Sequence, residues 1–161
     1  MTEVLCHIRD VEREVDLPRI LLAEDNPNDV ELTLEALAAH SLVNGVTVVH
    51  DGVEALAFLR REGAYRDRDP GHPAVVLLDI KMPRMDGIEV LREIRGDPAL
   101  KRIPVVVLTS SREQRDIVAS YDLGVNAYVV KPVDFPSFVR AVERVGAFWA
   151  IVNQPPPSEG D

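Results

Sequence analysis

Short apolar runs alternate with amphipathic stretches along most of the chain. The runs at 19–24, 46–50, 74–79, 103–109 and 126–132 are rich in Val, Ile and Leu and have the length of strands. They carry apolar residues at consecutive positions and are bounded by turn-forming or charged residues. This pattern predicts strands that are buried on both faces, as in a parallel sheet.

The stretches between these runs have the spacing of amphipathic helices. We expect helices over 25–41, 53–63, 86–95 and 112–124. Asn26 or Asn28 is expected to cap the first helix. Glycines are expected to end the other three, at Gly63, Gly96 and Gly124.

A last helix is expected to begin at Asp134, with Pro136 in its first turn, and to continue to about Val152. Five strands would then alternate with five helices. This alternation predicts an α/β fold with a parallel sheet, right-handed crossovers and helices on both faces.

The chain divides into one domain and two flanking segments. The domain is expected over 19–153, and the Pro-rich segment 154–161 is expected to be a flexible tail. Residues 1–18 form an N-terminal extension with apolar positions at helical spacing, which could pack on the domain or on a partner.

Composition and charge exclude several classes of protein. The 161 residues suit one domain, and the net charge of -9 argues against an extended nucleic-acid interface. Cys6 is the only cysteine, so no internal disulfide can form. No apolar run approaches the length of a membrane span, and the acidic N-terminus is unlike a signal peptide. We therefore expect a cytoplasmic protein with no membrane segment.

Polar residues follow the predicted strands at the points where they end, namely Glu24, Asp25, Asp79, Thr109 and Lys131. The carboxyl ends of parallel strands meet at one edge of the sheet, where ligands bind in open α/β folds. If the first strand neighbours the third, the acids converge. Two carboxylates about 4 Å apart repel by about 4 kcal/mol at an effective dielectric constant near 20, so a cluster of three needs a cation or protonation. Mg²⁺ suits such oxygen ligands. With an ammonium and a hydroxyl added, the set describes a site for a phosphoryl group, with Asp79 as the nucleophile.

Each of these residues also has an ordinary structural explanation when taken alone. Glu24-Asp25 before Asn-Pro can cap a helix, Asp79 can cap a turn, and Lys131 before Pro132 can end a strand. The site interpretation rests on their conjunction at one sheet edge. The histidines are His7, His40, His50 and His72. They lie at predicted helix ends, in turns or outside the domain, and we expect them to be solvated.

Four stretches, "ILLAEDNPND", "VVLLDIKMPRMDGIEVLREIR", "IPVVVLTSS" and "GVNAYVVKP", resemble the receiver domain of two-component response regulators over residues 19 to about 145. The resemblance implies a flavodoxin-like (βα)5 fold with strand order 2-1-3-4-5. It implies that Asp79 is the phosphoacceptor for a sensor histidine kinase. Mg²⁺ would be bound directly by Asp25, chiefly through water by Glu24, and by Asp79 and the backbone carbonyl of Lys81.

The same resemblance implies roles for residues on the last two strands. Thr109 would be the switch hydroxyl, and Lys131 would bind the phosphoryl oxygens. Tyr128 would be the switch aromatic that turns inward on phosphorylation, and Pro132 would follow a cis peptide bond. Many receivers have Asp-Asp where this chain has Glu24-Asp25, a difference that affects metal affinity rather than charge.

A narrower resemblance links the chain to stand-alone regulators of bacterial and cyanobacterial phytochrome kinases. It rests on "DGVEALAFLRREGAY" and "KPVDFPSFVRAVERVGAFWAIV", and it implies a phytochrome as the kinase. Few residues remain after the last predicted helix, so no DNA-binding or enzymatic output domain is expected. Apolar residues surround the end of that helix, namely Phe148, Trp149, Ile151 and Val152. They predict a homodimer interface, unless residues 1–18 cover them.

Three functions are compatible with this set of residues. The leading interpretation is a phosphorylation-controlled binding module that is not an enzyme beyond its own phosphorylation and dephosphorylation. A Mg²⁺-dependent aspartyl-phosphate phosphohydrolase would need an Asp two residues after the nucleophile, where this chain has Lys81. A scaffold that is never phosphorylated would have no need for all five residues at the sheet edge.

Overall fold

The computed structural model describes residues 20–38, 45–110, 125 and 127–146. Its elements follow one another in strict strand–helix alternation over most of this range. They are β1 (Ile20–Ala23), α2 (Pro27–Ala38), β2 (Val46–Val49), α3 (Gly52–Arg60), the short 3-10 helix η2 (Gly63–Tyr65), β3 (Val75–Asp79), α4 (Gly87–Gly96), β4 (Val105–Thr109), β5 (Tyr128–Val130) and α6 (Phe135–Arg144).

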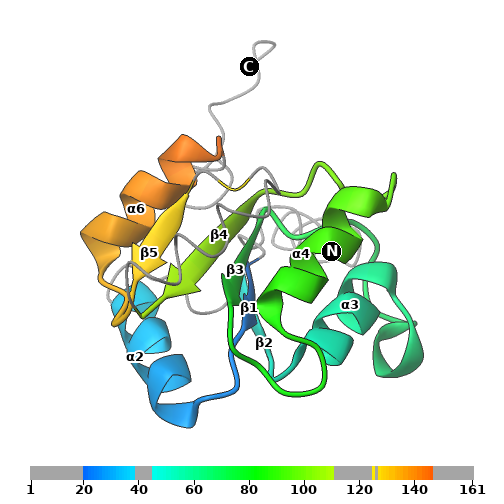
Figure 1. Ribbon diagram of the computed structural model, residues 1–161, viewed down its shortest axis with the longest axis horizontal. Coiled ribbons are helices and arrows are strands. Elements are labelled where there is room, and N and C mark those ends of the chain that lie inside the picture. The colour runs from blue at the N-terminus through cyan, green and yellow to red at the C-terminus, as the bar shows by residue number, and fades with distance from the viewer. Residues whose placement is uncertain (1–19, 39–44, 111–124, 126, 147–161) are drawn as a thin grey trace, which may run out of the picture.

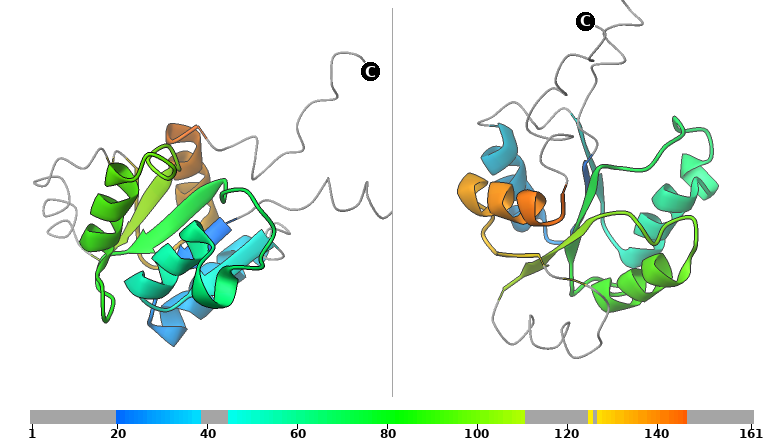
Figure 2. Two further views of the ribbon diagram at one scale, coloured as in Figure 1. Left: turned by 90° about the vertical axis from the view of Figure 1, so that its right-hand side faces the viewer. Right: turned by 90° about the horizontal axis from the view of Figure 1, so that it is seen from above.

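The five strands form one parallel sheet in the order β2-β1-β3-β4-β5 (Figure 1). Helices α2 and α6 cover one face, and α3 and α4 cover the other (Figure 2). The flavodoxin-like α/β fold and the strand order expected from the sequence are confirmed. No helix within the described ranges is both long and apolar enough to cross a membrane.

Two hydrophobic clusters hold the layers together, one on each face of the sheet. Successive residues of a strand point to opposite faces, so Leu21 packs with α3 and α4 whereas Leu22 packs with α2 and α6. Every residue of β3 is buried, because this central strand is covered on both sides. The sheet therefore holds Asp79, the last residue of β3, at a fixed position.

Local capping decides where the helices begin. The side chain of Asn26 accepts hydrogen bonds from the backbone N–H groups of Asn28 (2.8 Å) and Asp29 (3.2 Å), so Asn26 is the cap of α2 and Asn28 is not. Helix α4 begins with a capping box between Asp86 and Glu89.

The predicted end of α3 was wrong by a few residues. The helix ends at Arg60, and Arg61 adopts the left-handed conformation (φ 56°) that we expected a glycine to provide. The backbone N–H of Arg61 is satisfied by a hydrogen bond to the carbonyl oxygen of Phe58 (3.2 Å). Gly63 instead opens the 3-10 helix that leads into the loop before β3.

The predicted length of the last helix was also wrong. Helix α6 ends at Arg144, not near Val152, and Gly146 follows in a left-handed turn with φ 77°. The apolar spacing continues past Gly146 in the sequence, but the glycine allows the backbone to leave the helix. The proposed interface residues 148, 149, 151 and 152 lie outside the described residues, as do the N-terminal extension, the helix expected over 112–124 and the tail.

Candidate functional site

The polar residues singled out in the sequence converge at the carboxyl edge of the sheet. The register pairs Asp79 of β3 with Leu108 of β4, and Thr109 of β4 with Val130 of β5. Beyond the strand ends, the backbone N–H of Lys131 donates to the carbonyl oxygen of Thr109 (2.8 Å). The parallel register thus places the nucleophile candidate, the hydroxyl and the ammonium on three adjacent strands.

Three carboxylates form the acidic part of the site. One oxygen each from Glu24, Asp25 and Asp79 lies within 4.8 Å of the others. Glu24 is fully buried and Asp79 is 3% exposed, whereas Asp25 is open to solvent. Burial raises the pKa of Glu24 to about 7, with a further contribution from the charge of Asp79, and the hydrogen bond from Lys131 opposes this rise. Such a cluster of hard oxygen ligands with one solvent-facing member suits Mg²⁺, which keeps several waters.

Lys131 is the cation at the centre of the site. Its Nζ lies 3.0 Å from Glu24 Oε1, 3.0 Å from Asp79 Oδ1 and 3.0 Å from Asp29 Oδ2. Burial lowers the pKa of Lys131, but the three carboxylates outweigh this effect and hold the pKa above its usual value. The side chain therefore stays charged, with carboxylates of three residues around its ammonium.

Thr109 contributes a buried hydroxyl to the site. Its side chain is fully buried, and its Oγ1 has no hydrogen-bond partner among the described residues. An unsatisfied buried hydroxyl costs free energy, so its presence needs an explanation. Its place on β4, beside the strand that ends at Asp79, makes it available to a ligand bound to that carboxylate.

The loop after Asp79 is fixed to its surroundings at several points. Gly87 packs against the backbone of β3, where an added β-carbon would come within 2.8 Å of Ile80 Cα. Its N–H donates to the carbonyl oxygen of Ile80 (2.7 Å). On the other side, Arg84, at φ 67°, forms an ion pair with Asp51 (2.9 Å). These contacts hold the segment that contains Lys81, whose backbone carbonyl remains a predicted metal ligand.

Tyr128 and the Lys131–Pro132 bond complete the predicted set. The Tyr128 ring is half-buried against the core cluster on the α3/α4 face, and its hydroxyl donates to the carbonyl oxygen of Val125 (3.3 Å). The peptide bond between Lys131 and Pro132 is cis, as the resemblance implied. A switch movement of Tyr128 would have to break its contact with Val125.

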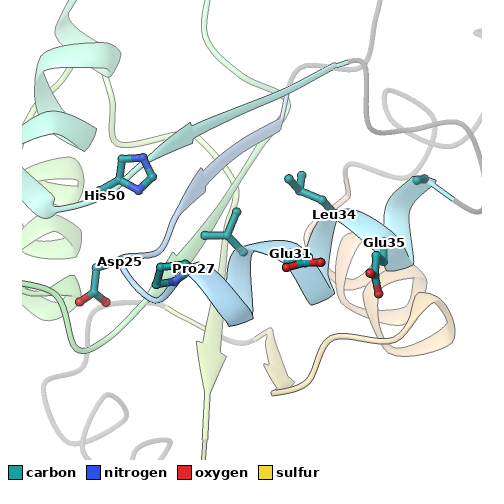
Figure 3. A pocket seen from close by; sticks show the side chains of 8 residues that line it. Asp25, Pro27, Glu31, Leu34, Glu35 and His50 are labelled. Atoms are coloured by element: carbon teal, nitrogen blue, oxygen red, sulfur yellow. The ribbon is translucent and has the colours of Figure 1, made fainter.

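An open groove of about 500 Å³ runs along α2 next to the acidic cluster (Figure 3). Its apolar lining includes Val30 and Leu34, and Asp25 stands at one end while Glu35 stands toward the other. A surface seated in this groove would therefore reach the neighbourhood of Asp79 through Asp25. His50 also lines the groove and is exposed, as expected for a solvated histidine.

Asp29 is the site residue that sequence reasoning missed. It occupies the first turn of α2, where an acidic residue is sufficiently explained by the helix dipole. Its ion pair with Lys131 joins positions 102 residues apart in the chain. Sequence spacing carries no signal for such a contact.

Comparisons with known proteins agree with this geometry. The model of the response regulator receiver domain matches residues 20–143. The response regulator Rcp1 of Synechocystis is 41% identical over 130 residues, which cover 81% of this chain and 87% of Rcp1. The solved Mn²⁺-bound form of Rcp1 superposes with a TM-score of 0.65 at 38% identity and covers 87% of this chain and 99% of that one.

Two solved phytochrome response regulators are also similar. The bacteriophytochrome response regulator AtBRR has a TM-score of 0.81 at 55% identity, covering 86% of this chain and 99% of that chain. The phosphorylated cyanobacterial phytochrome response regulator RcpA has a TM-score of 0.67 at 43% identity, covering 88% of this chain and all of its own (100%).

Proposed function

The chain belongs to the response regulator receiver family and is related to phytochrome response regulators, and we propose that it accepts a phosphoryl group on Asp79 from a sensor histidine kinase. The observation that carries the proposal is the buried hydroxyl of Thr109, which lacks a partner among the described residues and ends the strand beside Asp79. A phosphoryl oxygen on Asp79 would supply that partner.

The transfer forms one bond and breaks one. A carboxylate oxygen of Asp79 attacks phosphorus, and the bond from phosphorus to the nitrogen of a phosphohistidine breaks. The leaving imidazole takes the electron pair and then a proton. A carboxylate nucleophile needs no general base, so positioning and charge stabilisation are the main tasks of the site.

Residues around Asp79 divide these tasks. Glu24, Asp25, Asp79 and the Lys81 carbonyl would hold Mg²⁺, which when bound offsets the negative charge of the phosphoryl oxygens. Lys131, already 3.0 Å from Asp79, would donate to one phosphoryl oxygen, and Thr109 would donate to another. The Mn²⁺-bound form of the related Rcp1 supports this metal assignment.

We propose a phytochrome as the kinase, because relatives that match most of the chain are phytochrome response regulators. The groove along α2 is suited to receive part of the kinase, since its apolar lining at Val30 and Leu34 lies next to Asp25. A Leu34→Asp variant should lose phosphotransfer from the kinase while keeping its reaction with a small acyl phosphate. Equal losses with both donors would exclude the groove as a docking site.

The output is proposed to be a change in protein binding rather than catalysis on another substrate. Movement of Thr109 toward the phosphoryl group would leave space for the Tyr128 ring, which would break its 3.3 Å hydrogen bond to Val125. We also propose a homodimer through Phe148 and Trp149, on the basis of their apolar sequence context. Light scattering of the wild type and of a Phe148→Glu, Trp149→Glu variant tests it, and a monomeric wild type would refute it.

The alternatives have less support from the site. A phosphohydrolase of the haloacid-dehalogenase kind lacks its acid/base residue, since the exposed Lys81 stands at that position. An unphosphorylated scaffold would leave unexplained why the Thr109 hydroxyl has no hydrogen-bond partner among the described residues.

Incubation with a small acyl phosphate, followed by intact mass measurement, tests the proposal. We expect one phosphoryl group per chain with Mg²⁺, and none with a chelator or in Asp79→Asn. Asn keeps the shape of the side chain but lacks the nucleophilic oxygen. Equal labelling of wild type and Asp79→Asn would refute the proposal.

A further inference from the structure

The Lys131 ammonium donates hydrogen bonds to Glu24 and Asp29 and forms an ion pair with Asp79. Glu24, Asp79 and Asp29 each place one oxygen 3.0 Å from Nζ. An ammonium has three donors, and three carboxylate oxygens already lie at hydrogen-bond distance from Nζ. A phosphoryl oxygen that approaches Nζ therefore competes with these carboxylates for Lys131.

The three partners differ in what they would lose. The Glu24 side chain is 0% exposed, so water cannot replace Lys131 as its hydrogen-bond partner. Asp79 is 5% exposed in its side chain and would carry the phosphoryl group itself. The Asp29 side chain is 28% exposed, so its carboxylate can be hydrated as soon as Lys131 leaves it.

We propose that Asp29 is the partner that Lys131 exchanges for a phosphoryl oxygen. Asp29 is then a positioning residue that competes with the phosphoryl group for Lys131 and sets how readily the site is filled. This inference rests on the proposed function, because it requires a phosphoryl group on Asp79. It assigns to Asp29 a role that neither its place in the helix nor its charge alone would reveal.

The location of Asp29 favours a competitor over a permanent anchor. Its backbone is fixed in the first turn of α2, where its N–H donates to Asn26 Oδ1 (3.2 Å). The positive end of the helix dipole stabilises its carboxylate whether or not Lys131 is present. Release of Lys131 thus exposes a charge that the helix and water already tolerate.

The test measures binding of beryllofluoride, a stable phosphoryl mimic, to the full-length chain in the presence of Mg²⁺. Asp29→Asn should lower the half-saturating concentration about fivefold, which corresponds to about 1 kcal/mol. Glu31→Gln is the matched control, because it removes one negative charge from the same helix and Glu31 is not among the ion-pair partners of Lys131 within the described ranges. It should leave the half-saturating concentration nearly unchanged.

A second measurement needs no variant. The ¹³C resonance of the Asp29 carboxyl group in the wild type should shift on saturation with beryllofluoride, as its contact with Lys131 is lost.

A third measurement uses the Asp29→Glu variant, which restores the charge. It should return the half-saturating concentration toward the wild-type value. Both readouts report on the contact itself and would not respond to a merely structural role.

The outcomes separate this inference from the function it rests on. If the wild type and both single-charge variants bind beryllofluoride equally well, the exchange is refuted while the phosphoacceptor role stands. If Asp29→Asn binds more weakly, Asp29 is an anchor and the exchange is again refuted. Absence of binding by the wild type would refute both.

Discussion

Replacement of Lys131 by Met should destabilise the fold, because it removes the cation that three carboxylates share. The methionine keeps a similar length and shape but carries no charge. In the structure the side chains of Lys131, Glu24 and Asp79 are 13%, 0% and 5% exposed, respectively. The substitution would therefore leave two nearly buried carboxylates with no partner of opposite charge at hydrogen-bond distance among the described residues.

The expected cost follows from these distances and from desolvation. Each 3.0 Å contact corresponds to about 5.5 kcal/mol of attraction at an effective dielectric constant near 20. Much of this attraction is offset by desolvation, because burying the ammonium removes its water at a cost of several kcal/mol. Loss of one partner from a buried ion pair costs about 3–5 kcal/mol in proteins. We expect the free energy of unfolding of Lys131→Met to fall by about 3 kcal/mol.

Urea unfolding followed by circular dichroism, with a chelator present, measures this free energy. Lys101→Met is the matched control, because Lys101 is exposed and far from the site, and its loss should change the free energy by less than about 0.5 kcal/mol. Addition of Mg²⁺ should restore part of the stability of Lys131→Met, since the dication replaces the missing positive charge. Equal stability of the two variants in chelator would show that Lys131 does not balance the acidic cluster.

Three further predictions concern neighbouring features. Thr109→Ala should accept a phosphoryl group without loss of stability, because the hydroxyl it removes has no partner in the described part of the chain. Beryllofluoride should then shift the NMR signals of Tyr128 less in this variant than in the wild type. Gly87→Ala should lower the free energy of unfolding by about 1–3 kcal/mol, measured in urea, because its β-carbon would meet the backbone of β3. Burial and the carboxylate of Glu54 raise the pKa of Tyr65 to about 12 from 10.0. The contribution of the protonated Tyr65 to the free energy of unfolding is fully present below pH 10 and is lost as the pH rises toward 12. Tyr65→Phe should therefore lose less stability in urea over this interval than the wild type does.

The strand positions could be predicted because a buried parallel strand leaves a plain pattern in the sequence. The run that ends at Asp79 is apolar at consecutive positions, and the structure buries every residue of β3. The same reasoning brought Glu24, Thr109 and Lys131 to one edge, since parallel strands share the direction of their carboxyl ends. The strand order itself came from the family resemblance, because the apolar pattern is compatible with more than one order.

The errors occur where local backbone geometry or a distant contact decides the outcome. Helix α6 ends before Gly146 although apolar spacing continues, and α3 ends where Arg61 adopts a conformation more typical of glycine. The ion pair between Asp29 and Lys131 depends on packing of α2 against the sheet. Periodicity describes which face of a helix is buried. It does not determine which carboxylate of the helix meets a lysine at the end of a strand.

The location of the phosphoryl group tests the central claim most directly. The full-length protein would be phosphorylated with a small acyl phosphate and Mg²⁺, reduced with borohydride to convert an aspartyl phosphate to homoserine, digested and mapped by mass spectrometry. We predict homoserine at position 79 and at no other aspartate, including the neighbouring Asp25 and Asp29. Homoserine at another position, with Asp79 unmodified, would contradict the account of this site.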